Sequence, residues 1–438
     1  MTTHVFAGPT ISASRVREIL PGAFCHPPVK HGDLLALAAS PDDTVVIIDG
    51  LWHQSAPVRH KEILALLAAG TTVVGAASMG ALRAAELASY GMHGVGQIYR
   101  DYLTGLLEAD DEVAVLHSPT DQRLSEALVN IRAALTRCTA AGVITGDEAA
   151  ALLAIARRLP YDRRSWAGIG QLARAAYLTD LHDRANEWRK TNPHDLKRED
   201  AEAALLLVAE GSLPAPSTGR WRDGPWRTSF VRYWTAGHQP GPHGVPLLAV
   251  LHHQQLYDSG FPARWRRRVL AAITGGPATD ALLVMAAMRT AAEAGLDLTH
   301  LTPAQTAHWL TPDELLLDPN EALLRIIVRS ARLDGAWTVW PATWDEAEGL
   351  LQNAESAAST VATAFRLNDA VETADPRRTT AHLDPERIGR HLRDSWGLAE
   401  GATSAALDAA ARDRAFRDFA GAVEVARAFY LHSRAATA

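Results

Sequence analysis

The sequence predicts an α/β fold in which a parallel sheet comes first and an α-helical domain follows. Two observations support this prediction. Over residues 1–120, short apolar and β-branched runs alternate with helical segments, which is typical of parallel strands joined by helices on both faces of a sheet. From Leu124 onward the strand-like runs disappear, and Ala- and Leu-rich helical segments follow one another.

The predicted strands are continuous apolar runs, as expected of strands buried on both faces of a Rossmann-like sheet. They comprise His4–Ala7, Thr44–Ile48, Thr71–Val74 and Glu112–Leu116. Two helices lie between them, Pro57–Ala69 before Gly70 and Ala81–Tyr90 before Gly91. Proline in a first helical turn and glycine after a last turn are common helix boundaries.

Helix starts are also readable in the second part of the chain. Thr145 to Glu148 has the capping-box pattern, and Asp195–Glu210 reads as an amphipathic helix. Cap residues stand before proline at Thr302-Pro303, Thr311-Pro312, Asp318-Pro319 and Asp384-Pro385. We therefore expect an α/β core with trailing helices over 1–210, a Pro- and Gly-rich connector over 211–244 and a helical domain over 245–438.

Composition excludes several classes of protein. The net charge of −7 predicts neither a nucleic-acid partner nor an anionic membrane surface. Two cysteines cannot form a disulfide framework, and no apolar run approaches about 18 residues, so we expect a cytoplasmic protein without a membrane span. No phosphate-binding glycine motif follows a strand, and no metal-ligand spacing occurs, so no cofactor and no metal are expected.

Candidate site residues gather where the predicted strands end. In an open parallel sheet, ligands bind outside the carboxyl ends of the strands. Asp49, Ser78 and His117 follow three predicted strands. His60 begins a helix close to the same edge and shares a helix face with apolar residues, so we expect it to point toward the sheet.

Ser78 has two interpretations. It stands in Ala76-Ala77-Ser78-Met79-Gly80, between a strand and a helix and among small residues. This partly matches a nucleophile elbow, in which a serine on a sharp strand-to-helix turn lies beside the N–H groups of a helix start. The alternative is a serine that only caps the helix.

The remaining candidates have roles relative to Ser78. His60 is a candidate general base with Asp49 as its orienting carboxylate, and His117 is the competing base. Arg83 is a candidate carboxylate contact, with Glu86 three residues later as its partner. Each also has a structural alternative: a core histidine, a turn aspartate, or an ion pair along one helix.

Three further features have structural and functional interpretations. The acidic run Asp110-Asp111-Glu112 reads as a solvated loop or as a divalent-cation site. Cys25 beside His26 is either an inert or a reactive thiol. Arginine and aromatic residues alternate over 220–234, which suits either a packed hinge or a docking surface for a protein or peptide.

Several strings together resemble the core of the TfuA-like family. They are VFAGPTIS at 5–12, VIIDG at 46–50, HKEILALLAAG at 60–70, GAASMGALRAAEL at 75–87, YGMHGVGQIY at 90–99 and DDEVAVLH at 110–117. The resemblance covers residues 4–120 and extends to about residue 210, but not into the C-terminal half. The family commonly has a serine where this chain has Ala77, which leaves Ser78 for hydroxyl chemistry.

The resemblance implies a function and partners. TfuA-like proteins accompany YcaO proteins, which activate backbone amides with ATP, and the pair replaces an amide oxygen by sulfur in ribosomally made peptides. It implies an enzyme that hydrolyses a thiocarboxylated ThiS-type sulfur carrier to release sulfide, with a YcaO protein and a precursor peptide as partners. The alternative is a non-catalytic adaptor that docks the peptide or the YcaO protein.

Overall fold

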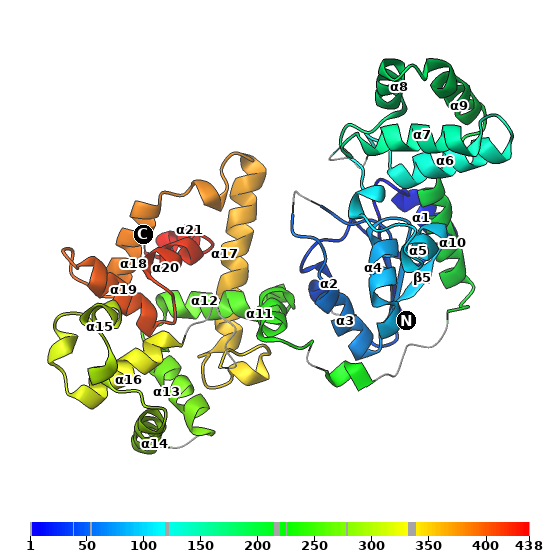
Figure 1. The fold of residues 1–438 in the computed structure, drawn as a ribbon. Coiled ribbons are helices and arrows are strands. Elements are labelled where there is room, and N and C mark those ends of the chain that lie inside the picture. Colours follow the sequence, from blue (N-terminus) through cyan, green and yellow to red (C-terminus); the bar gives the residue numbers. More distant parts are fainter. Residues whose placement is uncertain are drawn as a thin grey trace. The chain divides into compact units, whose positions relative to one another are not determined.

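The chain folds into two compact units, Met1–Trp226 and Arg227–Ala438 (Figure 1). The computed structural model describes residues 2–37, 39–52, 55–118, 122–213, 220–224, 226–276, 279–331 and 339–437. The boundary between the units lies inside the segment 211–244, in which we expected a connector. That segment is not a plain linker, because it contains the 3-10 turns η3 (Arg220–Asp223) and η4 (Pro242–Gly244) and the helix α11 (Ser229–His238).

The first unit is built on a five-stranded parallel sheet, which confirms the predicted α/β fold. Its strands are β1 (Thr3–Phe6), β2 (Phe24–His26), β3 (Thr44–Ile47), β4 (Thr72–Ala76) and β5 (His93–Val95), in the order β2-β1-β3-β4-β5. Val5 pairs with Val46, and Val46 pairs with Val74. The direction of strand addition reverses between β1 and β3, so this is the switch point where ligands bind in such sheets.

Helices cover both faces of the sheet because successive strand residues point to opposite sides. Val45, Ile47 and Val73 face the layer formed by α2 (Asp33–Ala36), α3 (His60–Ala69) and α4 (Met79–Leu87). Val46, Ile48 and Val74 face α1 (Ala13–Ile19) and α10 (Leu196–Ala209). The helix α5 (Gln97–Leu103) follows β5 and packs against α4 through Ile98 and Tyr102.

Two strands were not predicted, and one predicted strand was wrong. β2 and β5 are only three residues long, which is too short for a clear periodic signal. Residues 112–116 do not join the sheet. The chain there forms a 3-10 turn, η2 (Asp110–Glu112), and then an extended segment outside the sheet that ends at His117.

The acidic run in η2 is partly solvated, since Asp110 is exposed and the Asp111 side chain is 47% exposed, but two of its carboxylates also pair with arginines. Glu112 Oε1 lies 2.7 Å from Arg132 Nη2, and Asp111 Oδ2 lies 2.8 Å from Arg164 Nη2. Both Glu112 and Arg164 are buried. Arg132 from α6 and Arg164 from the chain before α8 therefore pair with Glu112 and Asp111 and hold the start of this segment beside the sheet.

The following helices form a group of their own beside the sheet in the first unit (Figure 1). They are α6 (Leu128–Ala140), α7 (Gly146–Arg157), α8 (Trp166–Ala175) and α9 (Thr179–Thr191), and they enclose a separate apolar core. The predicted capping box at Thr145 is confirmed. Thr145 Oγ1 accepts from the Glu148 N–H, and a Glu148 carboxylate oxygen accepts from the Thr145 N–H.

The second unit is helical in the part of the chain that the structure describes. After α11 it contains α12 (Leu247–Tyr257), α13 (Phe261–Thr274), α14 (Asp280–Glu293), α15 (Pro303–Trp309), α16 (Pro319–Ser330), α17 (Ala354–Ala374), α18 (Pro385–Ser395), α19 (Ser404–Asp413), α20 (Phe419–Ala426) and α21 (Tyr430–Thr437). One core surrounds Phe261 and Trp265, and another surrounds Val250 and Val361. None of the described helices in either unit is long and apolar enough to cross a bilayer.

Candidate functional site

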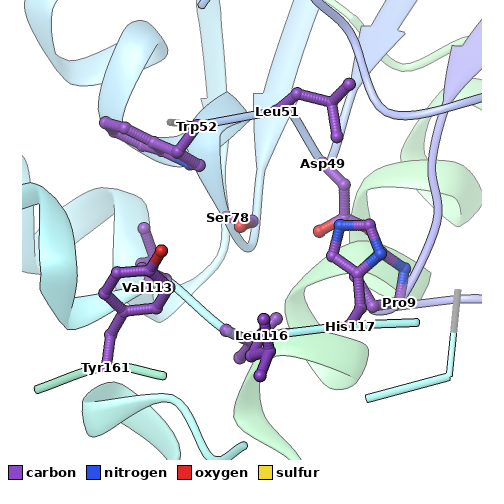
Figure 2. A pocket seen from close by; sticks show the side chains of 12 residues that line it. Pro9, Asp49, Leu51, Trp52, Ser78, Val113, Leu116, His117 and Tyr161 are labelled. Atoms are coloured by element: carbon purple, nitrogen blue, oxygen red, sulfur yellow. The ribbon is translucent and has the colours of Figure 1, made fainter. Parts of the chain in front are cut away.

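A small cavity of about 50 Å³ opens at the carboxyl ends of β3 and β4. It is lined by Pro9, Asp49, Gly50, Leu51, Trp52, Ser78, residues 113–117 and Tyr161 (Figure 2). In Figure 2, Ser78 lies between Trp52 and Tyr161 on one side and Asp49 and His117 on the other. The structure thus brings together three of the predicted site residues, Asp49, Ser78 and His117, in what we call the strand-end pocket.

Ser78 sits on a very sharp turn between β4 and α4. The Ser78 N–H donates to the carbonyl oxygen of Ala76 at 2.7 Å, and Ala77 between them has φ of 65°. A hydrogen bond between residues i and i+2 around a residue with positive φ is the signature of a rare, strained γ-turn. Such strain tends to mark functional positions, and here it turns the chain so that Ser78 lines the pocket.

The hydroxyl of Ser78 is not used to cap the helix. Ser78 occupies the N-cap position of α4, but its side chain makes no capping hydrogen bond. The residue is 4% exposed and lines the pocket, so its hydroxyl is available to a ligand there. This geometry favours the interpretation in which Ser78 contacts a bound group.

Two glycines allow α4 to begin so close to the sheet. A side chain at Gly80 would place its Cβ 1.7 Å from the carbonyl oxygen of Ile47, and one at Gly75 would place it 2.1 Å from the carbonyl oxygen of Gly80. The Gly80 N–H donates to the carbonyl of Ile48 at 3.2 Å, and the Ala81 N–H donates to that of Ser78 at 3.0 Å. These bonds use the N–H groups of Gly80 and Ala81. Of the first three N–H groups of α4, at most that of Met79 is therefore left to donate to a ligand oxygen, as a donor of an oxyanion site does.

Asp49 anchors the loop that follows β1. Its carboxylate accepts from the N–H groups of Gly8 and Thr10, each at 3.0 Å, and from the Thr10 hydroxyl at 2.6 Å. The residue is 2% exposed. Asp49 thus fixes the switch point between β1 and β3, and these bonds show no contact that would orient His60.

His117 ends the extended segment that forms one wall of the pocket. Its Nδ1 lies 2.9 Å from the carbonyl oxygen of Ser118. A carbonyl oxygen only accepts hydrogen bonds, so the neutral ring carries its proton on Nδ1 and has its lone pair on Nε2. That tautomer suits a general base.

A separate cluster on α3 and α4 consists of the exposed His60 and Glu86 and the buried Arg83. Glu86 Oε2 lies 2.8 Å from His60 Nε2 and 2.6 Å from Arg83 Nη1. Burial would raise the pKa of Glu86, but the hydrogen bonds from His60 and Arg83 outweigh it and lower that pKa. Glu86 is eight residues beyond Ser78, which is about 12 Å along a helix axis.

The expectation that His60 points toward the sheet is wrong, since its side chain is 47% exposed. It stands at the N-terminus of α3, where the ring turns toward Glu86 on α4 rather than following the apolar face. The pairing of Arg83 with Glu86, expected as one alternative, is confirmed at 2.6 Å.

Sequence reasoning missed Lys197, the most deeply buried charge beside the pocket. It is 1% exposed, and its Nζ donates to the carbonyl oxygen of Val113 at 2.9 Å and lies 3.9 Å from Asp49 Oδ1. The available signal was its position on α10, where it shares a helix face with Ala201, Ala204 and Val208. Trp52 and Tyr161 were missed as well, because only the folded chain brings them to the pocket.

The other candidate features do not join the strand-end pocket. Cys25 and His26 line a separate cavity of about 710 Å³ beside α1. In the 220–234 segment, Trp221 and Trp226 pack against the core of the first unit, so these two side chains are structural. Among the described residues, no group of three or more His, Cys, Asp or Glu side chains is placed to hold a metal ion.

Comparison with known proteins supports the resemblance found in the motifs. The family model described as TfuA-like protein matches residues 49–165. All residues that line the strand-end pocket, except Pro9, fall inside this segment. No curated protein matches the chain.

Proposed function

We propose that this protein is a TfuA-like accessory protein of YcaO-dependent thioamidation and that its strand-end pocket hydrolyses the thiocarboxylate of a ThiS-type sulfur carrier. The sulfide released would supply the YcaO protein, which acts on a ribosomally made precursor peptide. One observation carries the proposal: a pocket lined by Ser78, His117 and Asp49 lies, except for Pro9, within the matched segment. The partners follow from the family resemblance.

The size of the pocket supports a small reacting group. A cavity of about 50 Å³ accommodates the tip of a chain and not a folded surface. A thiocarboxylate at the end of a flexible tail is such a tip. Trp52 and Tyr161 would flank the tail, and Ser78 would meet its carbonyl carbon.

The proposed reaction is acyl transfer in two balanced steps. Ser78 Oγ attacks the thiocarboxylate carbon while His117 Nε2 takes the hydroxyl proton. His117 then gives this proton to the departing sulfur, the C–S bond breaks, and hydrosulfide leaves. Water, deprotonated by the same histidine, then attacks the acyl-serine ester. The histidine returns the proton to Ser78 Oγ as the ester C–O bond breaks, and the carrier leaves as a carboxylate. Asp49 keeps the loop of Gly8 to Thr10 in place during both steps.

The test is sulfide release from a thiocarboxylated ThiS-type carrier by the full chain. We expect Ser78→Ala and His117→Gln each to lower the rate by about 10²-fold or more, a typical loss for a nucleophile or a general base. His60→Gln, which alters the separate surface cluster, should leave the rate nearly unchanged. Loss of activity in His60→Gln with retention in His117→Gln would move the site to that cluster.

A wild-type chain that releases no sulfide, with and without its YcaO partner, would favour the adaptor. The adaptor hypothesis predicts that Ser78→Ala still forms a complex with the YcaO protein or the peptide. A pull-down run beside the sulfide assay therefore separates the two functions, because only the adaptor hypothesis predicts that the wild type and Ser78→Ala both form the complex while neither releases sulfide.

A further inference from the structure

Lys197 is a buried charge that the proposed reaction does not use. It is the second residue of α10, and its side chain is 2% exposed. Its ammonium meets two groups, the carbonyl oxygen of Val113 at 2.9 Å and Asp49 Oδ1 at 3.9 Å. Both Val113 and Asp49 line the strand-end pocket, whereas Lys197 itself does not.

These two contacts join three separate segments of the pocket wall. Asp49 follows β3, and its carboxylate holds the loop of Gly8 to Thr10 that follows β1. Val113 directly follows η2 and leads into the segment that ends at His117. That segment lies outside the five-stranded sheet. Near its end it is held by an antiparallel bridge between His117 and Arg123 and by the Leu124 N–H, which donates to the Leu116 carbonyl at 2.7 Å, whereas at its start Val113 meets Lys197. The contact between Lys197 and Val113 directly links this segment, which we call the His117 wall, to the switch point of the sheet.

An apolar residue would fill the same space on α10 without a buried charge. The positions that share this face, Ala201, Ala204 and Val208, are apolar and pack against the sheet. Burying an ammonium group is costly unless it is paired, and a hydrophobic replacement of a buried ion pair is often neutral for stability. Burial lowers the pKa of Lys197, and the Asp49 carboxylate opposes that effect. Stability alone gives little reason for a lysine at this position.

The start of α10 is itself held in place by polar contacts. The Lys197 N–H donates to Asn130 Oδ1 at 3.2 Å, and Asn130 Nδ2 donates to Asp195 Oδ1 at 2.9 Å. Asp195 Oδ2 also pairs with Arg123 Nη2 at 2.9 Å. Asp195, Arg123 and Glu126 are the other charged groups whose fields act on Lys197. These contacts fix the start of α10, so the Lys197 ammonium has one defined position between Val113 and Asp49.

We propose that Lys197 is a positioning residue of the strand-end pocket, where its ammonium holds the His117 wall against Asp49 so that His117 faces Ser78. The inference rests on the proposed hydrolysis at this pocket. Lys197 does not contact the substrate and acts only through the placement of His117.

The test compares Lys197→Met with the wild-type full chain in two measurements. In sulfide release, we expect kcat to fall about 100-fold, the effect of a small misplacement of a catalytic group, with KM nearly unchanged. In the ¹⁵N spectrum of histidine-labelled protein, the signal that His117→Gln removes should leave the position of the Nδ1-protonated tautomer. Lys190→Met is the matched control, because Lys190 is exposed and pairs with Glu187 on the surface of α9. It should alter neither measurement.

A second variant guards against simple misfolding. In Lys197→Met/Asp49→Asn, both buried charges are removed, so hydrogen-exchange protection of β3 and β4 should return toward the wild-type level. The His117 signal should stay displaced. An unchanged His117 signal and an unchanged kcat in Lys197→Met would overturn the proposal and leave Lys197 a structural residue. If the wild type releases no sulfide, the hydrolysis proposal fails, and the His117 signal still decides whether Lys197 positions the wall.

Discussion

Ala77 shows how a single residue shapes the candidate site. Its φ of 65° is unfavourable for a residue with a Cβ and costs about 1–2 kcal/mol. Glycine would avoid that cost, yet the Ala77 methyl group is completely buried among Val46, Ile48 and Val74. The strain is therefore offset by packing, and the turn that presents Ser78 is held from behind by the core.

This balance predicts an unusual response to Ala→Gly substitution. Ala77→Gly loses about 1 kcal/mol of methyl burial but relieves a strain of similar size, so stability should change by less than about 1 kcal/mol. Ala76→Gly, at the equally buried last residue of β4, relieves no such strain and should cost about 1–2 kcal/mol. Hydrogen exchange of β3 and β4 in the full chain measures both values. Equal losses in the two variants would mean that the turn at Ala77 is not strained.

Lys197 predicts a pH dependence with a definite sign. Burial lowers its pKa in the folded state below the ordinary value of 10.5, so between those two values the unfolded chain binds more protons. Stability from this group therefore rises as the pH increases toward about 10.5. Denaturant unfolding from about pH 8 to about pH 10 should shift in favour of the wild type relative to Lys197→Met. A constant difference across that range would show that Lys197 is not desolvated.

At the scale of elements, the approach of α4 to β3 depends on the absence of side chains. Gly80 meets the backbone of Ile47, which cannot rotate away as a flexible side chain would. Gly75 meets Gly80 from the neighbouring strand. The same two close contacts fix where α4 begins and therefore where Ser78 lies in the pocket.

Substitution of Gly80 should therefore affect folding and the site together. Gly80→Ala forces α4 away from β3 and should destabilise the first unit by about 3 kcal/mol or more, as overpacking against backbone does. Gly146→Ala is the matched control, because a Cβ at the first position of α7 meets nothing within 4 Å. It should be neutral or slightly stabilising. Thermal unfolding followed by circular dichroism compares the two, and a Gly80→Ala chain as stable as the control would contradict the close packing.

Local rules made some elements predictable. Thr302, Asp318 and Asp384 cap α15, α16 and α18 as expected, because a cap and a proline at the next position act within one helical turn. The α10 helix begins after its predicted cap, Asp195. The α3 helix begins three residues later than predicted, at His60, because Pro57 instead forms a bridge with Lys30 outside the helix.

Long-range contacts made the rest unpredictable. Residues 112–116 have the apolar pattern of a buried strand, but arginines from α6 and from the chain before α8 hold the start of this segment outside the sheet. The location of Asp49, Ser78 and His117 follows from the rule for strand ends, and the structure places all three in one pocket. Lys197 lies 148 residues beyond Asp49 in the sequence, and no local pattern connects the two.

At the scale of the whole molecule, the described apolar clusters of the two units are separate. Those around the sheet and α6 to α9 lie within residues 5–226, and those of the helical unit lie within residues 231–430. Units with separate cores can lose structure independently. Conditions that act on a charge network in one unit should therefore leave the other intact.

The second unit contains such a network around the buried Arg329. Its guanidinium donates to Glu314 Oε2 at 2.6 Å, to Asp413 Oδ1 at 2.7 Å and to the carbonyl oxygen of Trp309 at 2.6 Å, which joins α16 to the end of α19. Burial would raise the pKa of Glu314, but hydrogen bonds from Arg329 and the Thr311 N–H outweigh it and lower that pKa to about 2. The ionised carboxylate is thus tightly bound to the folded state.

Acid should consequently weaken the Arg329 network of the second unit. Because the pKa of Glu314 is depressed from 4.5 to about 2, its contribution is fully present above pH 4.5 and is lost as the pH falls through 2. A shift of this size corresponds to about 3 kcal/mol. Hydrogen exchange should show α16 and α19 losing protection over that range in the wild type. Glu314→Gln should already lack much of this protection at neutral pH and vary less with acid, whereas Glu372→Gln, at an exposed position of α17, should behave like the wild type. If α16 and α19 kept their protection as the pH fell through 2, the Arg329 network would not contribute to the stability of the second unit.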